Sequence, residues 1–256
     1  MSNINNEEQW RLSKYLSIFA SLSRRQAEKD IMDGLVLVNS SIPKNAAVIV
    51  GKKDIILYKK RRILPGKAIL EQSQQIICYA VYKPTGLIVT RSDEKKRPTV
   101  YTALPSELHN FHYIGRLDIN SEGLLLFTNN PKFARDLESP QNQIPRVYHV
   151  KAHGSVDDKK LHRMQKGVMI EGESYRPKDI KILSRTKESS SNTWFEITLV
   201  TGKNREIRKF LEHFNLKTAK LIRFSYGHLS IKDFNRDKLH RLSERHIKKF
   251  SGLISV

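Results

Sequence analysis

The sequence contains one cysteine, few acidic residues and no long apolar run. Cys78 is alone among 256 residues, which excludes an internal disulfide and a cysteine-based zinc site and favours a reducing cytoplasm. No apolar run approaches the roughly 20 residues of a membrane helix. The opening residues, MSNINNEEQW, also lack the basic and apolar segments of a secretion signal. These absences predict a cytoplasmic protein that does not enter a membrane.

The shortage of acidic residues leaves a large positive charge. Lysine and arginine number 46 against 26 aspartate and glutamate residues, which gives a formal net charge of +20. Such an excess predicts a polyanionic partner, with nucleic acid favoured over an anionic membrane surface. The membrane surface fits the charge alone, because the sequence has no basic amphipathic helix with an aromatic face. Hydrophobic residues make up 39% of the chain, enough for a folded core.

The sequence patterns of several common enzymes are missing. The chain has no G-x-x-x-x-G-K-[ST] phosphate loop, no G-x-S-x-G nucleophile elbow and no H-E-x-x-H metal motif. The nine histidines are scattered, and His109 and His112 lack the cysteine or carboxylate neighbours of a metal site. We therefore expect no metal site.

The apolar pattern predicts two folded units joined by a basic linker. Residues 11–58 fit two short helices followed by short strands, with Arg24 and Arg25 at the start of the second helix. Residues 59–75 open with KKRR, which fits either a solvated face or a tether that grips a nucleic-acid backbone. Residues 76–242 favour an α+β fold on a mixed, largely antiparallel sheet. In that unit we expect strands at 76–82, 86–90, 124–128, 146–153, 194–200 and 222–227, and helices at 131–139, 157–167 and 205–214.

Three segments of the larger unit carry candidate chemistry. GRLDINSEGLLLFT places Asp118 in a loop just before an apolar strand, where the carboxylate is either a structural clasp with Arg116 or a reactive group. RVYHVKAH places Tyr148 on a strand, with its phenol facing the core or a base. TGKNREIRKFLE begins a helix with several cations, a pattern suited to a phosphate. Together in a basic protein they indicate a nucleic-acid site with one nucleophilic or general-base carboxylate.

These segments resemble the ribosomal-RNA pseudouridine synthases of the RsuA and RluB type. The resemblance includes GRLDINSEGLLLFTNN, the K-P-x-G opening and R-P-T-V segment in YKPTGLIVTRSDEKKRPTVYTALP, and the R-x-Y-x-V strand. It continues through the G-x-N-R-E-[IV]-R helix and the closing LIRFSYGHLSI strand, in family order and over nearly the whole chain. Residues 11–58 resemble an S4 RNA-binding domain.

The resemblance implies a role for each matched residue. Asp118 occupies the place of the catalytic aspartate, Tyr148 that of the tyrosine that stacks on the base and helps remove its C5 proton, and Arg208 that of the arginine that holds the carboxylate. No cofactor and no metal are implied. Asp118 either attacks C1′ or removes the C2′ proton, and both routes remain open. The residues expected to contact RNA are Arg24, Arg25, Lys59, Lys60, Arg61, Arg62, Arg116, Lys203, Asn204 and Arg205.

The resemblance leaves the substrate less defined than the reaction. The R-P-T-V segment and the long SVDDKKLHRMQKGVMIEGE insertion favour 23S over 16S ribosomal RNA as the target. The partner is then that RNA or a ribosome assembly intermediate, and the expected enzyme is a monomer. A non-catalytic S4-type RNA-binding protein would explain the charge equally well. The intact set of Asp118, Tyr148 and Arg208 favours the enzyme.

Overall fold

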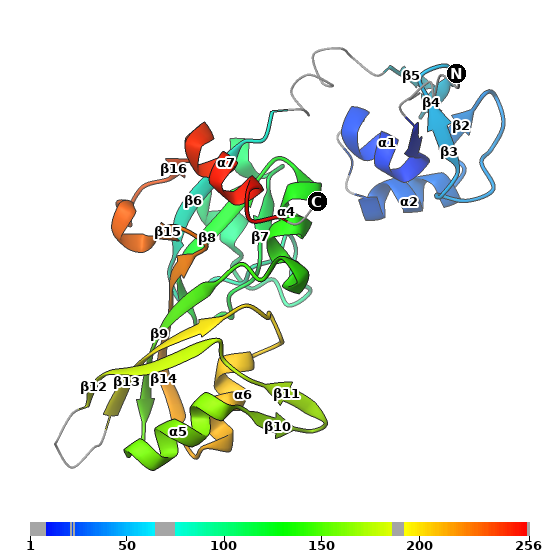
Figure 1. The fold of residues 1–256 in the computed structure, drawn as a ribbon. Coiled ribbons are helices and arrows are strands. Elements are labelled where there is room, and N and C mark those ends of the chain that lie inside the picture. Colours follow the sequence, from blue (N-terminus) through cyan, green and yellow to red (C-terminus); the bar gives the residue numbers. More distant parts are fainter. Residues whose placement is uncertain (1–8, 21, 23, 65–74, 186–191, 255–256) are drawn as a thin grey trace, which may run out of the picture. The chain divides into compact units, whose positions relative to one another are not determined.

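A computed structural model describes residues 9–20, 22, 24–64, 75–185 and 192–254. The chain forms two compact units, residues 1–75 and residues 76–256 (Figure 1). Within the described ranges, no helix combines the length and the apolar character needed to cross a membrane. The fold is the predicted one: a small α/β unit followed by a larger unit on a mixed sheet.

The first unit packs two helices against short strands. Helices α1 (Leu12–Phe19) and α2 (Arg24–Met32) are followed by a three-stranded antiparallel sheet in the order β2 (Val36–Val38), β4 (Ile56–Tyr58) and β5 (Arg61–Ile63). A separate pair joins β1 (Gln9–Arg11) to β3 (Ile49–Gly51). Leu12, Tyr15 and Leu16 from α1 meet Ala27 and Ile31 from α2 in the core. Helical spacing in the sequence predicted these core residues, but the same spacing also predicted Met32, which is 70% exposed.

The start of the predicted linker belongs to the first unit. Lys59 and Lys60 form the two-residue turn of the β4–β5 hairpin, and Arg61 and Arg62 lie in β5. The buried Tyr15 ties β5 to α1, because its hydroxyl donates to the Ile63 carbonyl at 3.0 Å. The charge run concealed this strand because its side chains are exposed and polar, whereas strand recognition relied on apolar alternation. Residues 65–74 of the predicted linker lie outside the described residues.

One large mixed sheet organises the second unit. Its main path runs β12 (Asp179–Arg185), β13 (Asn192–Leu199), β9 (Arg146–His153), β14 (Lys217–Tyr226), β8 (Glu122–Thr128), β6 (Cys78–Lys83) and β16 (His240–Arg241). β7 (His112–Ile114) pairs with β8, and β15 (Leu229–Ser230) pairs with β14. The β14–β8 pair is parallel, and the other ladders of this sheet are antiparallel. A small hairpin of β10 (Val168–Ile170) and β11 (Glu173–Tyr175) stands beside the sheet.

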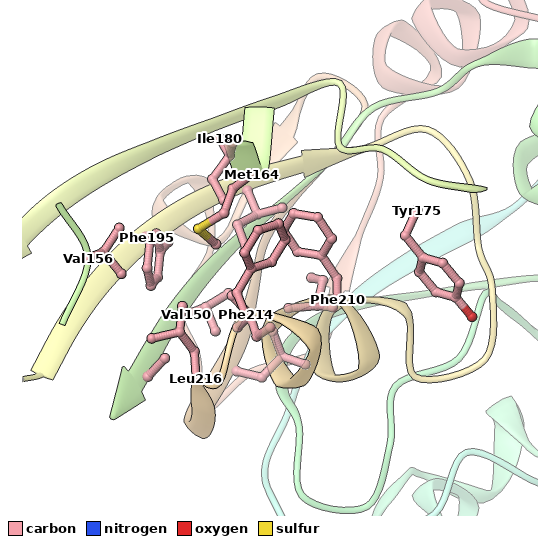
Figure 2. Packing of buried hydrophobic residues seen from close by; sticks show 14 of the residues in the cluster. Val150, Val156, Met164, Tyr175, Ile180, Phe195, Phe210, Phe214 and Leu216 are labelled. Carbon is pink, nitrogen blue, oxygen red and sulfur yellow. The ribbon is translucent and has the colours of Figure 1, made fainter. Parts of the chain in front are cut away.

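The helices cover opposite faces of the two halves of the sheet. α4 (Pro131–Glu138) and α7 (Glu244–Ser251) pack onto one face near β6 and β8, through Phe133, Leu137 and Phe250. α5 (Asp158–Lys166) and α6 (Glu206–His213) pack onto the other face near β9, β12 and β13. Figure 2 shows Phe210 and Phe214 at this second interface, between α6 and the strands.

Several predicted boundaries differ from the structure. Residues 86–90 form a loop and not a strand, with a single bridge from Ile88 to Thr99. Pro98, the residue before Thr99, has no N–H to donate, so the ladder cannot extend from this bridge toward Gly86. The second unit also continues past residue 242, because Phe250 of α7 is buried in its core. β12 was not predicted, because charged residues alternate with its isoleucines and the segment has no continuous apolar run.

Candidate active site

One row of neighbouring residues crosses the sheet beneath the loop that carries Asp118. In register across β6, β8, β14 and β9 lie Lys83, Gly123, Arg223 and Tyr148. Gly123 has a φ of +114°, and a Cβ atom there would lie 2.4 Å from the Arg223 carbonyl oxygen. Only glycine permits this approach of β8 to β14. The row therefore places two long cationic side chains, Lys83 and Arg223, on either side of Gly123 under the loop.

Lys83 holds the loop from below. The residue is 1% exposed, and its ammonium donates to the carbonyl oxygens of Ser121 at 2.7 Å, Pro84 at 2.9 Å and Asp118 at 3.2 Å. Burial lowers the pKa of Lys83 from 10.5 to about 8, and the neighbouring Asp118 charge opposes part of that shift. An ammonium has three donors, and all three are used here.

Arg223 holds the same loop from the other side of Gly123 in the row. It is 1% exposed, and its guanidinium donates to the carbonyl oxygens of Leu124 at 2.6 Å and Arg116 at 3.4 Å. The loop's first glycine, Gly115, donates its N–H to Glu138 of α4 at 2.6 Å. Lys83 and Arg223 were not singled out from the sequence. The only signal was their position in the K-P-x-G and L-I-R motifs, because a cation at a strand end usually means solvent.

Asp118 is paired with Arg208 and not with Arg116. The Arg208 Nε atom lies 3.4 Å from Asp118 Oδ2, and its Nη2 atom donates to the Asn120 carbonyl at 3.2 Å. Arg208 also contacts the Ser121 hydroxyl at 3.3 Å. Arg116 is exposed, and no ion pair joins it to Asp118 within the described ranges. The clasp of Arg116 with Asp118, one of the two sequence alternatives, is therefore absent from this part of the chain.

The carboxylate of Asp118 remains reachable from solvent. Its side chain is 33% exposed, whereas that of Arg208 is 11% exposed. Arg208 comes from α6, whose buried face of Ile207, Phe210 and Leu211 fixes the helix on the sheet. A fixed cation beside an accessible carboxylate can orient that carboxylate toward a ligand while leaving one side open.

Tyr148 lies in the same row, next to Arg223. It is half-buried and packs at the junction of two apolar clusters, one with α6 and one with Leu117 and Phe127. Its side chain therefore points to the face of the sheet that carries the Asp118 loop. The structure thus brings Asp118, Arg208 and Tyr148 to one face, with Arg116 exposed on the same loop.

The cations before α6 have different surroundings from one another. The ammonium of Lys203 donates to the Ser174 carbonyl at 2.8 Å, lies 3.4 Å from Glu173 and sits 4.9 Å from the centre of the Tyr175 ring. Lys203 therefore anchors the β10–β11 hairpin. The carboxylate of Glu206 accepts the Lys203 N–H at 3.0 Å, so the start of α6 already holds an anion. Asn204 and Arg205 are exposed.

The remaining predicted RNA contacts belong to the first unit. Arg24 and Arg25 are exposed in the first turn of α2, and Lys59, Lys60, Arg61 and Arg62 are exposed in the β4–β5 hairpin. Both lysines of the turn have positive φ, 48° and 64°, a conformation that usually selects glycine or asparagine. In the described part of the chain, no cluster of three or more His, Cys, Asp or Glu residues is arranged to hold a metal ion.

Comparison with known proteins gives the arrangement a family context. Residues 77–213, more than half of the chain, match the family described as RNA pseudouridylate synthase, and residues 10–56 match the S4 domain. A Rickettsia bellii protein named uncharacterized RNA pseudouridine synthase is 41% identical over 242 residues, which cover 93% of this chain and 97% of that protein.

The relatives named ribosomal large subunit pseudouridine synthase B are longer than this chain. Ribosomal large subunit pseudouridine synthase B of Haemophilus influenzae is 37% identical over 235 residues, covering 90% of this chain and 63% of that protein. The protein of the same name from Pasteurella multocida is 36% identical, covering 86% of this chain and 63% of that protein. A solved structure described as a pseudouridylate synthase superposes with a TM-score of 0.63 at 22% identity, over 94% of this chain and 99% of that one. This last likeness concerns the fold.

Proposed function

We propose that this chain, which belongs to the RNA pseudouridylate synthase family, modifies one uridine of 23S ribosomal RNA. It is an RNA pseudouridine synthase, an isomerase, and its first unit contains an S4 domain. The relatives named large subunit synthase B support the 23S target, together with the R-P-T-V segment and the insertion at 155–173. The substrate is either free RNA or RNA in an assembling ribosomal subunit. The enzyme acts as a monomer.

The observation that most supports the proposed reaction is the Asp118–Arg208 ion pair, which lies on the same face of the sheet as Tyr148. Asp118 acts at the sugar, either by attacking C1′ or by removing the C2′ proton. The N1–C1′ bond breaks, the base turns, and C1′ bonds to C5. The proton on C5 then leaves while N1 gains one. Arg208 keeps the carboxylate of Asp118 oriented throughout, and the buried Lys83 and Arg223 keep the loop in place.

The target uridine leaves its stack to reach Asp118. Extrusion costs roughly a few kcal/mol, and stacking on Tyr148 returns about 1–3 kcal/mol of it. Exposed cations of the first unit, with Arg116 and Arg205 of the second, grip phosphates and select which uridine is presented. Lys203 contributes little to that grip, since its ammonium already holds the β10–β11 hairpin.

The test uses 23S and 16S transcripts made with 5-tritiated uridine. Pseudouridylation releases the tritium from C5, so the enzyme should release about one equivalent from 23S RNA and none from 16S RNA. Carbodiimide-stop primer extension on the product then locates the nucleotide. Release from 16S RNA alone would overturn the 23S target while leaving the reaction intact. Binding to both RNAs without any release would favour the alternative of a non-catalytic RNA-binding protein.

A further inference from the structure

The sheet has an uncovered face behind the active site. In the half formed by β12, β13, β9 and β14, alternate residues such as Val150, Phe195 and Ile197 pack against α5 and α6. Tyr148 points to that covered face as well. The residues between them point to the opposite face, where the described part of the second unit places neither of these helices (Figure 1).

Two rows of residues on this face contain lysine and histidine and no acidic residue in register. One row pairs Trp194 with Lys151 and Lys151 with Lys220, and the next pairs His153 with Lys217. Carboxylates lie in the following row, where Glu196 binds Lys181 and His149 and Glu122 pairs with Ile222. We call Trp194, Lys151, Lys220, His153 and Lys217 the rear patch.

Two lysines of the rear patch repel each other electrostatically. Lys151 and Lys220 face each other directly across β9 and β14, and like charges in that position destabilise a sheet. Lys220 is compensated by Glu122, 2.7 Å away. Lys151 is half-buried and forms no ion pair within the described ranges. An anion bound from outside would remove this repulsion.

Trp194 gives the patch an aromatic surface. The tryptophan is half-buried, and it makes neither a ring contact nor an indole hydrogen bond in the parts of the chain described. The nearby Phe224, by contrast, is stacked on His149 at 4.1 Å and lies beneath Lys232. A partly exposed tryptophan among lysines suits a nucleobase, whose flat face stacks on aromatic rings while the phosphates meet the cations.

We propose that the rear patch binds a single-stranded segment of the substrate RNA, outside the active site. A base stacks on Trp194, and the adjoining phosphates lie along Lys151, Lys217 and Lys220. The inference rests on RNA as the substrate of this chain, and it adds a second contact surface on the other side of the sheet. RNA fits this patch better than an acidic protein because the cations surround a partly exposed aromatic ring on which a base can stack.

Fluorescence of Trp194 tests the proposal directly. The chain has two tryptophans, so Trp10→Phe in the full chain leaves Trp194 as the single reporter. An oligouridylate of about 12 nucleotides should quench its emission in a saturable way. Adding Asp118→Asn should not change this quenching, since Asp118 belongs to the other face.

Charge variants provide the matched comparison. Lys151→Gln with Lys217→Gln should weaken binding and reduce the slope of log K against log salt by about 1.4, because each phosphate that is no longer neutralised lowers the slope by about 0.7. Lys159→Gln with Lys166→Gln removes the same charge from α5, on the covered side, and should leave the quenching curve nearly unchanged. Trp194→Ala, measured by filter binding, should weaken binding of the oligouridylate about 5- to 100-fold.

Three outcomes would overturn the proposal. The first is unchanged Trp194 emission at RNA concentrations that saturate filter binding. The second is an equal effect of the rear-patch and α5 variants. The third is quenching by polyglutamate but not by RNA, which would assign the face to an acidic protein. Tritium release by the unaltered chain is measured separately, so a failure of the proposed reaction would not be mistaken for a failure of this site.

Discussion

Raising the pH from about 7 to about 9.5 should slow catalysis roughly thirtyfold while the protein stays folded. The reason lies in Lys83, whose three hydrogen bonds to the carbonyls of Pro84, Asp118 and Ser121 require a charged ammonium. A neutral amine has two N–H donors, so one carbonyl of the Asp118 loop loses its partner. Burial places the pKa of Lys83 at about 8, within reach of an ordinary assay.

As the pH rises, the loss of the Lys83 charge should lower the rate of catalysis and raise the free energy of unfolding. With a pKa of about 8, roughly 90% of Lys83 is charged at pH 7 and roughly 10% at pH 9, so the rate should fall about tenfold over that interval. The folded pKa lies below the unfolded value of 10.5. Between about 8 and 10.5 the unfolded chain therefore binds more protons, and this group raises the free energy of unfolding by up to roughly 3 kcal/mol.

Single-turnover tritium release measures the rate, and thermal melts at each pH confirm that the chain is folded. Uridine itself loses its N3 proton in alkaline solution, so variants are needed as controls. Lys83→Arg keeps its charge and should move the alkaline limb to higher pH. Lys83→Met should be slow at every pH and lack the limb. An alkaline limb near 8 that persists in a folded Lys83→Arg protein would refute the assignment to Lys83.

Three further predictions concern a glycine, a tyrosine and a pair of arginines. Gly123→Ala should lower the free energy of unfolding, measured in urea melts, by about 2–6 kcal/mol, because positive-φ strain adds to the clash with Arg223. The control is Gly172→Ala, which has a positive φ but open space around it. It should lower the free energy of unfolding only by the strain. Tyr148→Phe should slow tritium release yet still rearrange 5-fluorouridine RNA, where no C5 proton needs removal; equal failure on both RNAs would make Tyr148 a positioning residue only. Arg24→Gln with Arg25→Gln should lower the salt slope of rRNA binding by about 1.4, and an unchanged slope would leave these arginines as a solvated helix face.

Sequence patterns predicted the parts of the fold that apolar periodicity controls. The strand at 146–153 and the helices at 131–139, 157–167 and 205–214 agree with β9, α4, α5 and α6 within one residue at each end. These segments alternate or repeat cleanly because one side of each is buried. The loop around Asp118 was also predicted, since Gly115 and Gly123 bound it on either side.

Residues whose burial contradicts their chemistry were harder to predict. Lys83 and Arg223 are charged but only 1% exposed, and nothing in periodicity distinguishes a buried cation from a solvated one. The RNA contact of Lys203 stays a prediction; in the structure its ammonium contacts the Tyr175 ring and the Ser174 carbonyl. Arg208 of α6 reaches Asp118 across 90 residues of sequence, a contact that only the family resemblance suggested.

The Asp118→Asn variant tests the central claim most directly. The amide is nearly isosteric with the carboxylate, but it can neither attack C1′ nor remove a proton. Single-turnover tritium release from 5-tritiated 23S RNA should fall to background, while filter binding of the same RNA stays within a few-fold of the unaltered chain. Tritium release near the unaltered rate, with RNA binding intact, would contradict the account and remove Asp118 from the reaction.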